Sequence, residues 1–482
     1  MESAAPTALL GVNIELRGSH PEGVDGARRA VSEMVETIAP EAPIRAGRSY
    51  LSSALTARQI RELVVTDRDL AGGPPEAGTS PDAPPGGPSG GPSGAPDQAR
   101  LSPPQSAPRW AIHRIWPNFE VRALTYRTVT TTKCDASLRA FRATGAGLVW
   151  AVLDSGIDGT HAHFERYHNL VLPAGLAHRS FVHDAGEEDP LVDNDGHGTH
   201  VAGIIAGESM GEVIAATYYQ DDSGNRTSSP QTIASISGMA PQCTLLSFKV
   251  LRSDGSGDTA ALLDALEYVS EVNNGGRDLR VHGVNLSVGY PFDPSWFSAG
   301  QTPVCREVDR LVRSGVVVVA AAGNTGYGYA FDSEERQVQL GLGLTINDPG
   351  NAECAITVGA TSTRPHLTGV SHFSSKGPTG DGRLKPDLVA PGERVVSAAA
   401  GQALAEAEAR VPGARYVENS GTSMAAPHVS GVAAGFLSVH QEFLGRPEDV
   451  KRILLASATD LGRDPTFQGR GLVDAMRAIQ SV

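Results

Sequence analysis

The sequence predicts an α/β fold built around a mainly parallel β-sheet that is covered by helices on both faces. From about residue 130 onward, apolar runs of roughly four to eight residues alternate with longer stretches of helical periodicity. A strand with one face in water alternates between apolar and polar residues, whereas these runs are apolar throughout. Such runs are typical of parallel strands buried on both faces.

The expected strands follow one another along the chain with helices between them. In chain order these strands are Leu148–Leu153, Thr244–Val250, Val281–Val288, Val316–Ala322 and Ile356–Ala360. Helical periodicity predicts helices over Thr259–Val272 and Val304–Arg313, which separate the second, third and fourth strands. In sheets of this kind functional sites form just beyond the carboxyl ends of the strands, so the residues that follow each strand are the first candidates.

A smaller α+β module is expected at residues 1–71, before the main domain. Leu9–Leu16 alternates between apolar and polar residues like a strand. Gly26–Ile38 and Ser52–Val65 have the spacing of two helices. A segment of about 70 residues with this pattern makes a marginal independent domain.

A segment rich in glycine and proline separates this module from the rest of the chain. Residues 72–108 contain 11 prolines, 8 glycines and no aromatic residue in 37 positions. Such a composition buries too little apolar surface to offset the entropy of ordering, which predicts a disordered linker or insertion. Residues 109–129 would connect this segment to a catalytic domain at 130–482. Ile112–Pro117 would then be the last strand of the module.

The composition excludes several classes of protein. The chain has 482 residues with 40 basic and 54 acidic side chains, and its net charge of −14 argues against a nucleic-acid partner. No apolar run reaches the roughly 18 residues that a membrane span requires. The first residues lack the basic and apolar regions of a signal peptide, so the protein is expected to be cytoplasmic. The absence of C-x-x-C spacing predicts ordinary reduced thiols at Cys134, Cys243, Cys305 and Cys354.

Three motifs carry residues of catalytic types. Asp154 directly follows the first apolar strand, where a carboxylate is costly to bury unless it is paired. His197 lies in the stretch D-G-H-G-T-H-V-A-G at 195–203, where an expected helix of small residues begins. Ser423 lies in G-T-S-M-A-A-P-H-V-S-G at 421–431, before an apolar helix whose N-terminus favours developing negative charge.

Each of these residues alone also has an ordinary structural explanation. Asp154 would serve as a cap or turn residue, Ser423 as an N-cap and His197 as a structural histidine. His197 and His200 have the spacing of a metal pair, but no H-E-x-x-H pattern accompanies them, so no metal site is predicted. The order of the three residues favours catalysis, because Asp, His and Ser follow one another in the order known from subtilisin. Chymotrypsin-like enzymes and α/β-hydrolases have other orders.

With these motifs the chain resembles the subtilisin-like serine proteases, the subtilases. The matching stretches are V-L-D-S-G-I-D at 152–158 and the two longer motifs around His197 and Ser423. The resemblance covers roughly residues 130–482 and implies the three-layer α/β/α fold of that family. It further implies a serine endopeptidase that acts on polypeptides through an acyl-enzyme, with Asp154, His197 and Ser423 as its catalytic triad.

The resemblance also implies an oxyanion site and a substrate cleft. Asn324 ends the stretch A-A-G-N after the fourth strand, so its side-chain amide would bind the oxyanion beside the N–H of Ser423. Two other segments are similar to the family's cleft walls, whose glycines let the backbone of an extended peptide approach. The residues expected to bind substrate are Ser253, Gly255, Ser256, Gly257, Leu286, Ser287, Val288, Gly289, Ala322 and Gly323.

Two regions depart from the family's compact pattern. Glu208–Ser237 is longer than usual and does not reproduce a calcium loop, so no cofactor is required, although a structural calcium ion remains an option. Asp221 and Asp222 are interpreted as part of a solvated loop rather than as cation ligands. Residues 327–347 are inserted after the oxyanion asparagine, where the family builds one side of the pocket for the P1 side chain. The P1 preference stays open, because this insertion would either line or cover the pocket with Tyr327, Tyr329 and Phe331.

Two further questions concern the N-terminal module and the triad. The module is similar to the family's inhibitory propeptide, in the stretch Tyr50–Thr56 and a helix through Leu63. It would then be an intramolecular inhibitor removed by autocleavage between Phe119 and Thr132, whereas an unrelated docking domain is the alternative. A catalytically inactive subtilase that binds peptides is the alternative to an enzyme. That alternative predicts a damaged triad or oxyanion residue, and all four residues are present.

Overall fold

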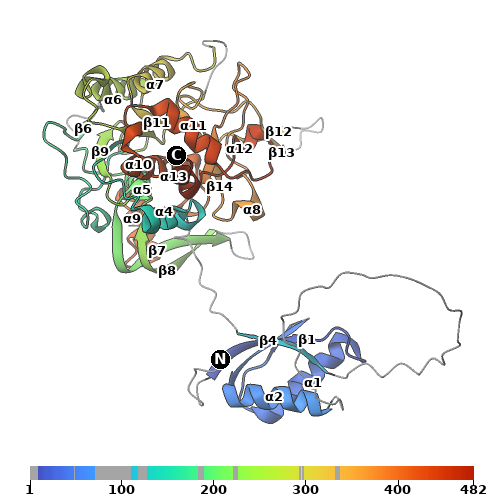
Figure 1. Ribbon diagram of the computed structural model, residues 1–482. Coiled ribbons are helices and arrows are strands. Elements are labelled where there is room, and N and C mark those ends of the chain that lie inside the picture. The colour runs from blue at the N-terminus through green and yellow to red at the C-terminus, as the bar shows by residue number, and fades with distance from the viewer. Residues whose placement is uncertain are drawn as a thin grey trace, which may run out of the picture. The chain divides into compact units, whose positions relative to one another are not determined.

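The computed structural model describes residues 9–47, 49–70, 110–117, 128–182, 189–220, 226–291, 295, 298–331 and 337–482. The chain forms two compact units, Met1–Arg122 and Ala123–Val482 (Figure 1). Each unit has a sheet and a hydrophobic core of its own. The segment 72–108, predicted to be a linker, lies outside the described residues.

The N-terminal unit is a four-stranded antiparallel sheet covered by two helices. Its elements are β1 (Leu9–Leu16), α1 (Gly23–Ile38), β2 (Arg45–Ala46), β3 (Tyr50–Thr56), α2 (Ala57–Leu70) and β4 (Ile112–Pro117). The strands lie in the order β2-β3-β1-β4, with β4 paired to β1. Alternate residues of the central strands, such as Ile14 and Leu51, are fully buried against Val31 of α1 and Leu63 of α2.

The helix predicted over Ser52–Val65 begins only at Ala57, so the prediction is wrong for its first five residues. These five residues belong to β3, where every second side chain is buried against the helices. A capping box sets the boundary, because the Thr56 N–H donates to Oε1 of Gln59 (2.8 Å) and the Gln59 N–H donates to Oγ1 of Thr56 (3.3 Å). Helical spacing and strand spacing overlap in this short run, and pairing with β1 decided between them.

The larger unit is built on a seven-stranded sheet. Its strands are β5 (Val149–Asp154), β6 (Arg179–Ser180), β9 (Thr244–Lys249), β10 (Gly283–Leu286), β11 (Val317–Ala321), β14 (Ile356–Thr361) and β15 (Leu388–Pro391). They lie in the order β15-β14-β11-β10-β5-β9-β6, and every neighbouring pair is parallel. All five predicted strands belong to this sheet, and the short strands β6 and β15 complete its edges.

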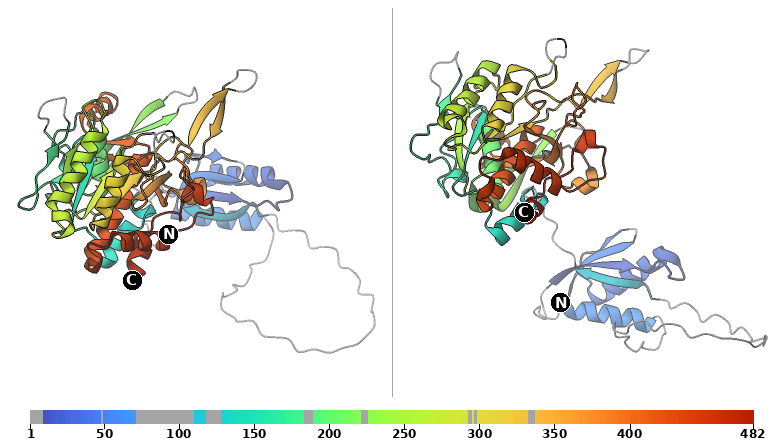
Figure 2. Two further views of the ribbon diagram at one scale, coloured as in Figure 1. Left: turned by 90° about the horizontal axis from the view of Figure 1, so that it is seen from above. Right: turned by 45° about the horizontal axis from the view of Figure 1, so that its top comes forward.

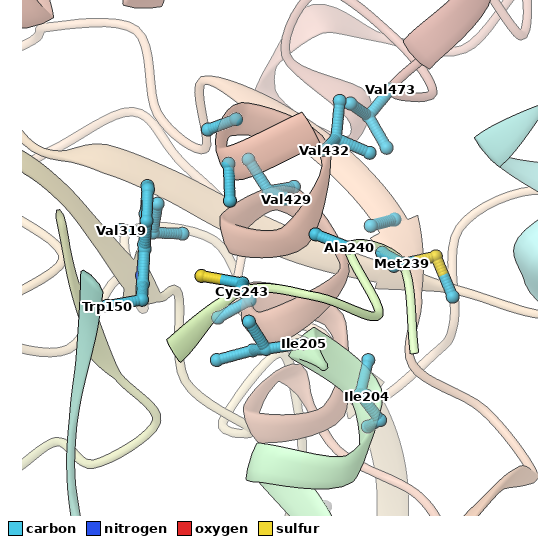
Figure 3. Close-up of a cluster of buried hydrophobic side chains, with 14 of the residues drawn as sticks. Trp150, Ile204, Ile205, Met239, Ala240, Cys243, Val319, Val429, Val432 and Val473 are labelled. Carbon is cyan, nitrogen blue, oxygen red and sulfur yellow. The ribbon is translucent and has the colours of Figure 1, made fainter. Parts of the chain in front are cut away.

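Helices cover both faces of this sheet. The helices of the larger unit are α3 (Thr128–Thr131), α4 (Cys134–Phe141), α5 (His197–Ile205), α6 (Thr259–Val272), α7 (Pro303–Arg313), α8 (Pro365–Thr368), α9 (Gly401–Arg410), α10 (Thr422–Val439), α11 (Pro447–Ser457), α12 (Pro465–Gln468) and α13 (Ala475–Gln480). Trp150 and Val152 of β5 point into a core that contains α5 and α10 (Figure 3). Ala151 and Leu153 point the opposite way, into a core with α6 and α7, which lie side by side in Figures 1 and 2. The predicted three-layer α/β/α fold is therefore confirmed.

A second, smaller sheet contains most of the long stretch Glu208–Ser237. Its strands are β7 (Glu208–Gln220), β8 (Arg226–Ser237), β16 (Val395–Ala398) and β17 (Tyr416–Asn419), in the order β16-β17-β7-β8. β7 and β8 form a long antiparallel pair, because Ala215 and Ile233 on facing strands bury their side chains with Tyr416. The interpretation of Asp221 and Asp222 as part of a solvated loop stays a prediction. Asp221 and Asp222 lie outside the described residues.

The insertion after Asn324 contains a two-stranded hairpin. It consists of β12 (Tyr327–Phe331) and β13 (Gln337–Gly341), and Figure 2 shows it projecting from the body of the larger unit. Tyr327 stacks edge-on against His372, with ring centroids 5.4 Å apart. Tyr327 is not among the residues that line the large cleft of this unit, whereas the side chains of Tyr329 and Phe331 lie outside the described residues.

The four cysteines are free thiols, and three of them are buried. Burial raises the pKa of the Cys134 and Cys243 thiols to about 12, which keeps both in the unreactive protonated form. Within the described part of the chain, no helix is both long and apolar enough to cross a membrane.

Candidate active site

Three neighbouring strands of the large sheet end at one cleft. β5 ends at Asp154, while Ser287 and Asn324 follow the ends of β10 and β11. Two helices begin at the same edge, because α5 starts at His197 and α10 carries Ser423 in its first turn. The cleft has a volume of about 780 Å³, and four of these five residues line it, with Asp154 buried behind His197. The parallel sheet thus brings together residues that are far apart in the sequence.

Asp154 and His197 form a pair in which the carboxylate is buried and the imidazole is 25% exposed toward the cleft. Nδ1 of His197 lies 2.7 Å from Oδ1 of Asp154, and this oxygen also accepts the N–H of Ser155 at 2.8 Å. Because an ionised carboxylate only accepts hydrogen bonds, Nδ1 carries the proton and Nε2 is the basic nitrogen that faces the cleft. The side chain of Asp154 is 1% exposed, and its second oxygen has no hydrogen-bond partner among the described residues.

The surroundings of His197 raise its pKa. Burial is the largest single effect and by itself lowers the pKa of the imidazole. The negative charge and hydrogen bond of Asp154, together with the charges of Asp195 and Asp193, outweigh it and raise the pKa from 6.5 to about 9. The site therefore stabilises the positively charged imidazolium.

Two glycines let the start of α5 approach its neighbours closely. Gly196 precedes the helix with φ of +101°, and a Cβ at this position would lie 2.3 Å from the carbonyl oxygen of Ala400. A Cβ on Gly198 would lie 2.1 Å from the carbonyl oxygen of Gly156 and 3.1 Å from Cβ of Asp154. Only residues without a side chain fit here, which explains the G-H-G sequence around the histidine.

Asp193 holds the turn before the histidine, and sequence reasoning missed it. Its Oδ1 accepts hydrogen bonds from the Ser155 hydroxyl and the Gly196 N–H, both at 2.8 Å. Its Oδ2 accepts the N–H and the hydroxyl of Thr199 at 2.8 and 2.6 Å. Burial raises the pKa of Asp193, although these hydrogen bonds oppose the shift. An acidic residue just before a helix start was the available signal, since this is typical of a cap.

Ser423 lies in the first turn of α10, where backbone N–H groups have no partner within the helix. Its hydroxyl donates a hydrogen bond to the carbonyl oxygen of Ser287 at 2.8 Å. A serine hydroxyl has a single proton, so in this arrangement that proton is not given to Nε2 of His197. The hydroxyl of Ser423 must turn away from the Ser287 carbonyl before it can donate to His197.

The side chain of Asn324 is oriented by the start of the same helix. Its Oδ1 accepts the N–H of Thr422 at 2.9 Å and the Thr422 hydroxyl at 3.1 Å. With Oδ1 engaged in this way, Nδ2 is the end of the amide that remains available to a ligand, and it lies close to Gly421. The amide donor and the N-terminus of α10 thus stand beside each other in the cleft.

The cleft contains most of the residues that were expected to bind substrate. Gly255, Gly257, Ser287, Val288, Gly289 and Gly323 line it. Ser253 and Ser256 lie on an exposed turn, where their hydroxyls bond to Asn194 and Asp254. Leu286 and Ala322 are fully buried, so their side chains belong to the core and do not face the cleft.

Ten of the residues that line the cleft were missed from the sequence, among them Asp195, Tyr290 and Asn347. Asp195 accepts the N–H of His197 at 3.0 Å, and its place in the histidine motif was the available signal. Tyr290 and Asn347 carried no signal, because neither belongs to a recognised motif and Asn347 is the last residue of the insertion at 327–347. The side chain of Asn347 lies against Gly323, where a Cβ would come within 2.7 Å of its Cγ.

Among the described residues, no group of three histidines, cysteines or acids is arranged to hold a metal ion. Nε2 of His200 faces the carbonyl oxygens of Val417 and Val395 at 3.1 and 3.2 Å, so it donates a proton there. A structural calcium ion stays a prediction, because Asp221 and Asp222 lie outside the described part of the chain.

Comparison with known proteins identifies the family. Residues 145–471 match the model of the subtilase family. Serine protease AprX of Bacillus subtilis (strain 168) is 30% identical over 76% of this chain and 74% of its own length. Subtilisin E of the same organism is 31% identical over 70% of this chain and 67% of its own length. Subtilisin DY of Bacillus licheniformis is 30% identical over 70% of this chain and 92% of its own length.

The matched region includes the whole cleft. Asp154, His197, Asn324 and Ser423 all lie within residues 145–471, and the match spans more than half of the chain. The fold agrees with the match, because the parallel sheet and its two helical layers lie within the same residues. This chain therefore belongs to the subtilase family and is a serine-type endopeptidase.

Proposed function

We propose that Ser423, His197 and Asp154 are the nucleophile, the general base and the orienting carboxylate of peptide-bond hydrolysis. The observation that carries this proposal is the 2.7 Å pair of His197 and Asp154, which opens on the cleft that also holds Ser423. A serine hydroxyl is a poor nucleophile until a base removes its proton. The pair supplies that base with Nε2 facing the cleft.

In the first step a peptide lies along the cleft walls and the Ser423 hydroxyl turns from the Ser287 carbonyl toward Nε2 of His197. The oxygen attacks the peptide carbonyl while its proton passes to Nε2. Hydrogen bonds of this kind are often absent without substrate and form in the complex. Asp154 accepts the hydrogen bond from Nδ1–H throughout and stabilises the imidazolium.

The negative charge on the carbonyl oxygen is stabilised by donors that are already in place. Nδ2 of Asn324 and the N–H of Ser423 are the two donors, and the N-terminal end of α10 adds its dipole. In subtilisin, the loss of the corresponding asparagine costs about 10²–10³ in kcat. The same order of loss is expected for Asn324→Ala.

The remaining steps reuse the same groups. The imidazolium of His197 gives its proton to the leaving amine, which breaks the peptide bond and leaves an acyl group on Ser423. A water molecule then attacks this ester while His197 takes one of its protons. Release of the acid returns the hydroxyl of Ser423.

The test is labelling with a fluorophosphonate, which reacts only with an activated serine. The wild-type chain is expected to be labelled and Ser423→Ala to be unlabelled at the same melting temperature. Ser438→Ala, at the other end of α10, is the matched control and should be labelled like the wild type. Full labelling of Ser423→Ala would remove Ser423 from its role. Absence of labelling in the wild type would favour a subtilase that only binds peptides.

We further propose that the N-terminal unit is an intramolecular inhibitor that the enzyme removes from itself. Its support is a separate α/β unit with its own core, joined in sequence to the catalytic unit. The last residues of the expected cleavage range, Thr131 and Thr132, are hydrogen-bonded to the catalytic unit. Thr132 is fully buried and its carbonyl accepts the N–H of Ala475 at 2.9 Å, while the Thr131 hydroxyl donates to the carbonyl of Thr363 at 2.9 Å. Cleavage is therefore expected before Thr128.

Intact-mass spectrometry of the purified chain tests this maturation. The wild type is expected to lose a fragment that ends between Phe119 and Thr128, whereas Ser423→Ala keeps its full mass. A fully active wild type that retains Met1 would contradict the proposal and favour a docking domain. Cleavage of Ser423→Ala at the same site would show that another protease does the processing.

A further inference from the structure

The helix that carries the nucleophile lacks one of its own hydrogen bonds. In an α-helix the carbonyl of one residue accepts the N–H of the residue four positions later. For Ser423 in α10 that later residue is Pro427, which has no N–H. Both residues lie in the first turns of the helix, and Pro427 is buried. The carbonyl of the nucleophile thus needs a donor from elsewhere in the fold.

Ser287 supplies this donor. Its hydroxyl donates to the carbonyl oxygen of Ser423 at 2.8 Å. In return the hydroxyl of Ser423 donates to the carbonyl oxygen of Ser287, also at 2.8 Å. The backbone just after β10 and the first turn of α10 are therefore joined by two reciprocal bonds.

Two buried side chains fix the direction of the Ser287 hydroxyl. Nδ2 of Asn285 donates to Oγ of Ser287 at 2.8 Å, so the proton of that hydroxyl is directed to its other partner, the Ser423 carbonyl. Oδ1 of Asn285 in turn accepts the hydroxyl of Ser430 at 2.8 Å. Asn285 and Ser430 are fully buried and Ser287 is 3% exposed, so water does not compete for these bonds. The chain of bonds runs from α10 through β10 and back to α10.

We propose that the Ser287 hydroxyl, oriented by Asn285 and Ser430, is a positioning group for the nucleophile, replacing the donor that Pro427 removes from α10. It acts through the backbone of Ser423. The first turn of α10 fixes the position of the Ser423 Cβ, which carries the nucleophilic oxygen. It also fixes the direction of the Ser423 N–H, which donates to the oxyanion. This inference rests on the proposed role of Ser423.

The first experiment compares the full-length chain with Ser287→Ala, using a peptide substrate and the fluorophosphonate probe. Ser287→Ala is expected to lower kcat and the labelling rate about tenfold, which corresponds to about 1.4 kcal/mol. KM and the pH midpoint are expected to stay within twofold and 0.3 units of the wild type, roughly the precision of such measurements. Although Ser287 lines the cleft, its hydroxyl donates to the Ser423 carbonyl, the residue is only 3% exposed, and His197 is unchanged. Ser287→Thr keeps the hydroxyl and should recover most of the lost rate.

A matched control separates positioning from stability. Ser137 is 2% exposed and its hydroxyl donates to a helix carbonyl, that of Cys134, at 2.9 Å. Ser137→Ala therefore removes the same type of buried bond far from the cleft in sequence. It is expected to lower the melting temperature as much as Ser287→Ala does, with kcat unchanged. If both variants lost kcat equally, the Ser287 bond would contribute to stability only and would not position the nucleophile.

A double-mutant cycle with Pro427→Ala tests the physical reason. Alanine restores an N–H that can donate to the Ser423 carbonyl, so removal of the Ser287 hydroxyl should then cost less than about threefold in kcat. A tenfold loss in both backgrounds would overturn the proposed link to Pro427. An unchanged kcat in Ser287→Ala, or a change in KM alone, would overturn the positioning role. These outcomes are distinct from failure of the catalytic assignment, which would appear as an unlabelled wild type.

Discussion

The glycine that follows the catalytic histidine should be intolerant of even one added carbon atom. A Cβ at Gly198 would lie 2.1 Å from the carbonyl oxygen of Gly156, about 1.3 Å short of an ordinary contact at 3.4 Å. The neighbouring atoms are the backbone of Gly156 and the Cβ of Asp154, neither of which is the end of a flexible side chain that could move aside. In Gly198→Ala the start of α5 and the backbone just after β5 must therefore separate by about 1.3 Å.

This separation acts directly on the catalytic pair. The bond between His197 and Asp154 is 2.7 Å long, and an added 1.3 Å would bring it to about 4 Å, beyond hydrogen-bond range. A misplacement of about 1 Å costs on the order of 10²-fold, and complete loss of the carboxylate's orienting effect costs about 10⁴-fold. We therefore expect kcat/KM of Gly198→Ala to fall by about 10²–10⁴, with about 1–3 kcal/mol of lost stability.

The assay is kcat/KM on a peptide substrate, with circular dichroism to verify the fold at the assay temperature. Gly343→Ala is the matched control, because a Cβ there meets only the Gly377 carbonyl oxygen at an ordinary 3.7 Å. The control should keep the activity of the wild type within about twofold, a margin typical of surface substitutions. Folded Gly198→Ala with activity within threefold of the wild type would refute the packing argument.

Two further predictions follow from the titration of histidines. Since burial lowers the pKa of His197 but Asp154 and Asp195 raise it above 6.5, kcat/KM should rise with pH through an apparent pKa above 6.5. Asp195→Asn removes one of these charges and should move this midpoint to lower pH, so an unchanged or higher midpoint would contradict the electrostatic explanation. His163, His200 and His428 are buried, and burial lowers their pKa values from 6.5 to about 3, 3 and 4, so the folded chain holds them in the neutral form. The unfolded chain binds these protons near pH 6.5 and the folded chain does not, so stability is full above pH 6.5. It should fall below that pH by about 1.4 kcal/mol per unit for each histidine. Thermal unfolding of the inactive serine variant between pH 7 and 4.5 measures this, and a flat profile would count against buried neutral histidines.

The sequence was most informative where one local pattern specifies one structure. The helix Thr259–Val272 was predicted with the bounds that the structure has, because its periodicity is undisturbed and Asp258 caps it. Five of the seven strands of the parallel sheet were found because they are apolar on both faces. The family was predicted from the order and residue types of three motifs, and the comparisons confirmed the family.

The errors occurred where a local pattern fits two structures. Ser52–Thr56 has spacing that suits a helix or a strand, and pairing with β1 made it a strand. The strands β7 and β8 were not predicted, and pairing of these two segments with each other and burial against Tyr416 made them strands. In both cases the deciding partner lies on another segment, which local periodicity does not report.

By itself, the sequence determined the fold class, the family and the identity of the candidate catalytic residues. Only the tertiary structure decided how these residues meet. In the folded chain, Asp154 can bond to His197 because Gly198 has no side chain to keep α5 away from the end of β5. The carbonyl of Ser423 accepts a hydrogen bond from the Ser287 hydroxyl. The physical reason is that such contacts join strand ends and helix starts far apart in the chain. Their distances depend on how the sheet and helices pack, and no short motif encodes that packing.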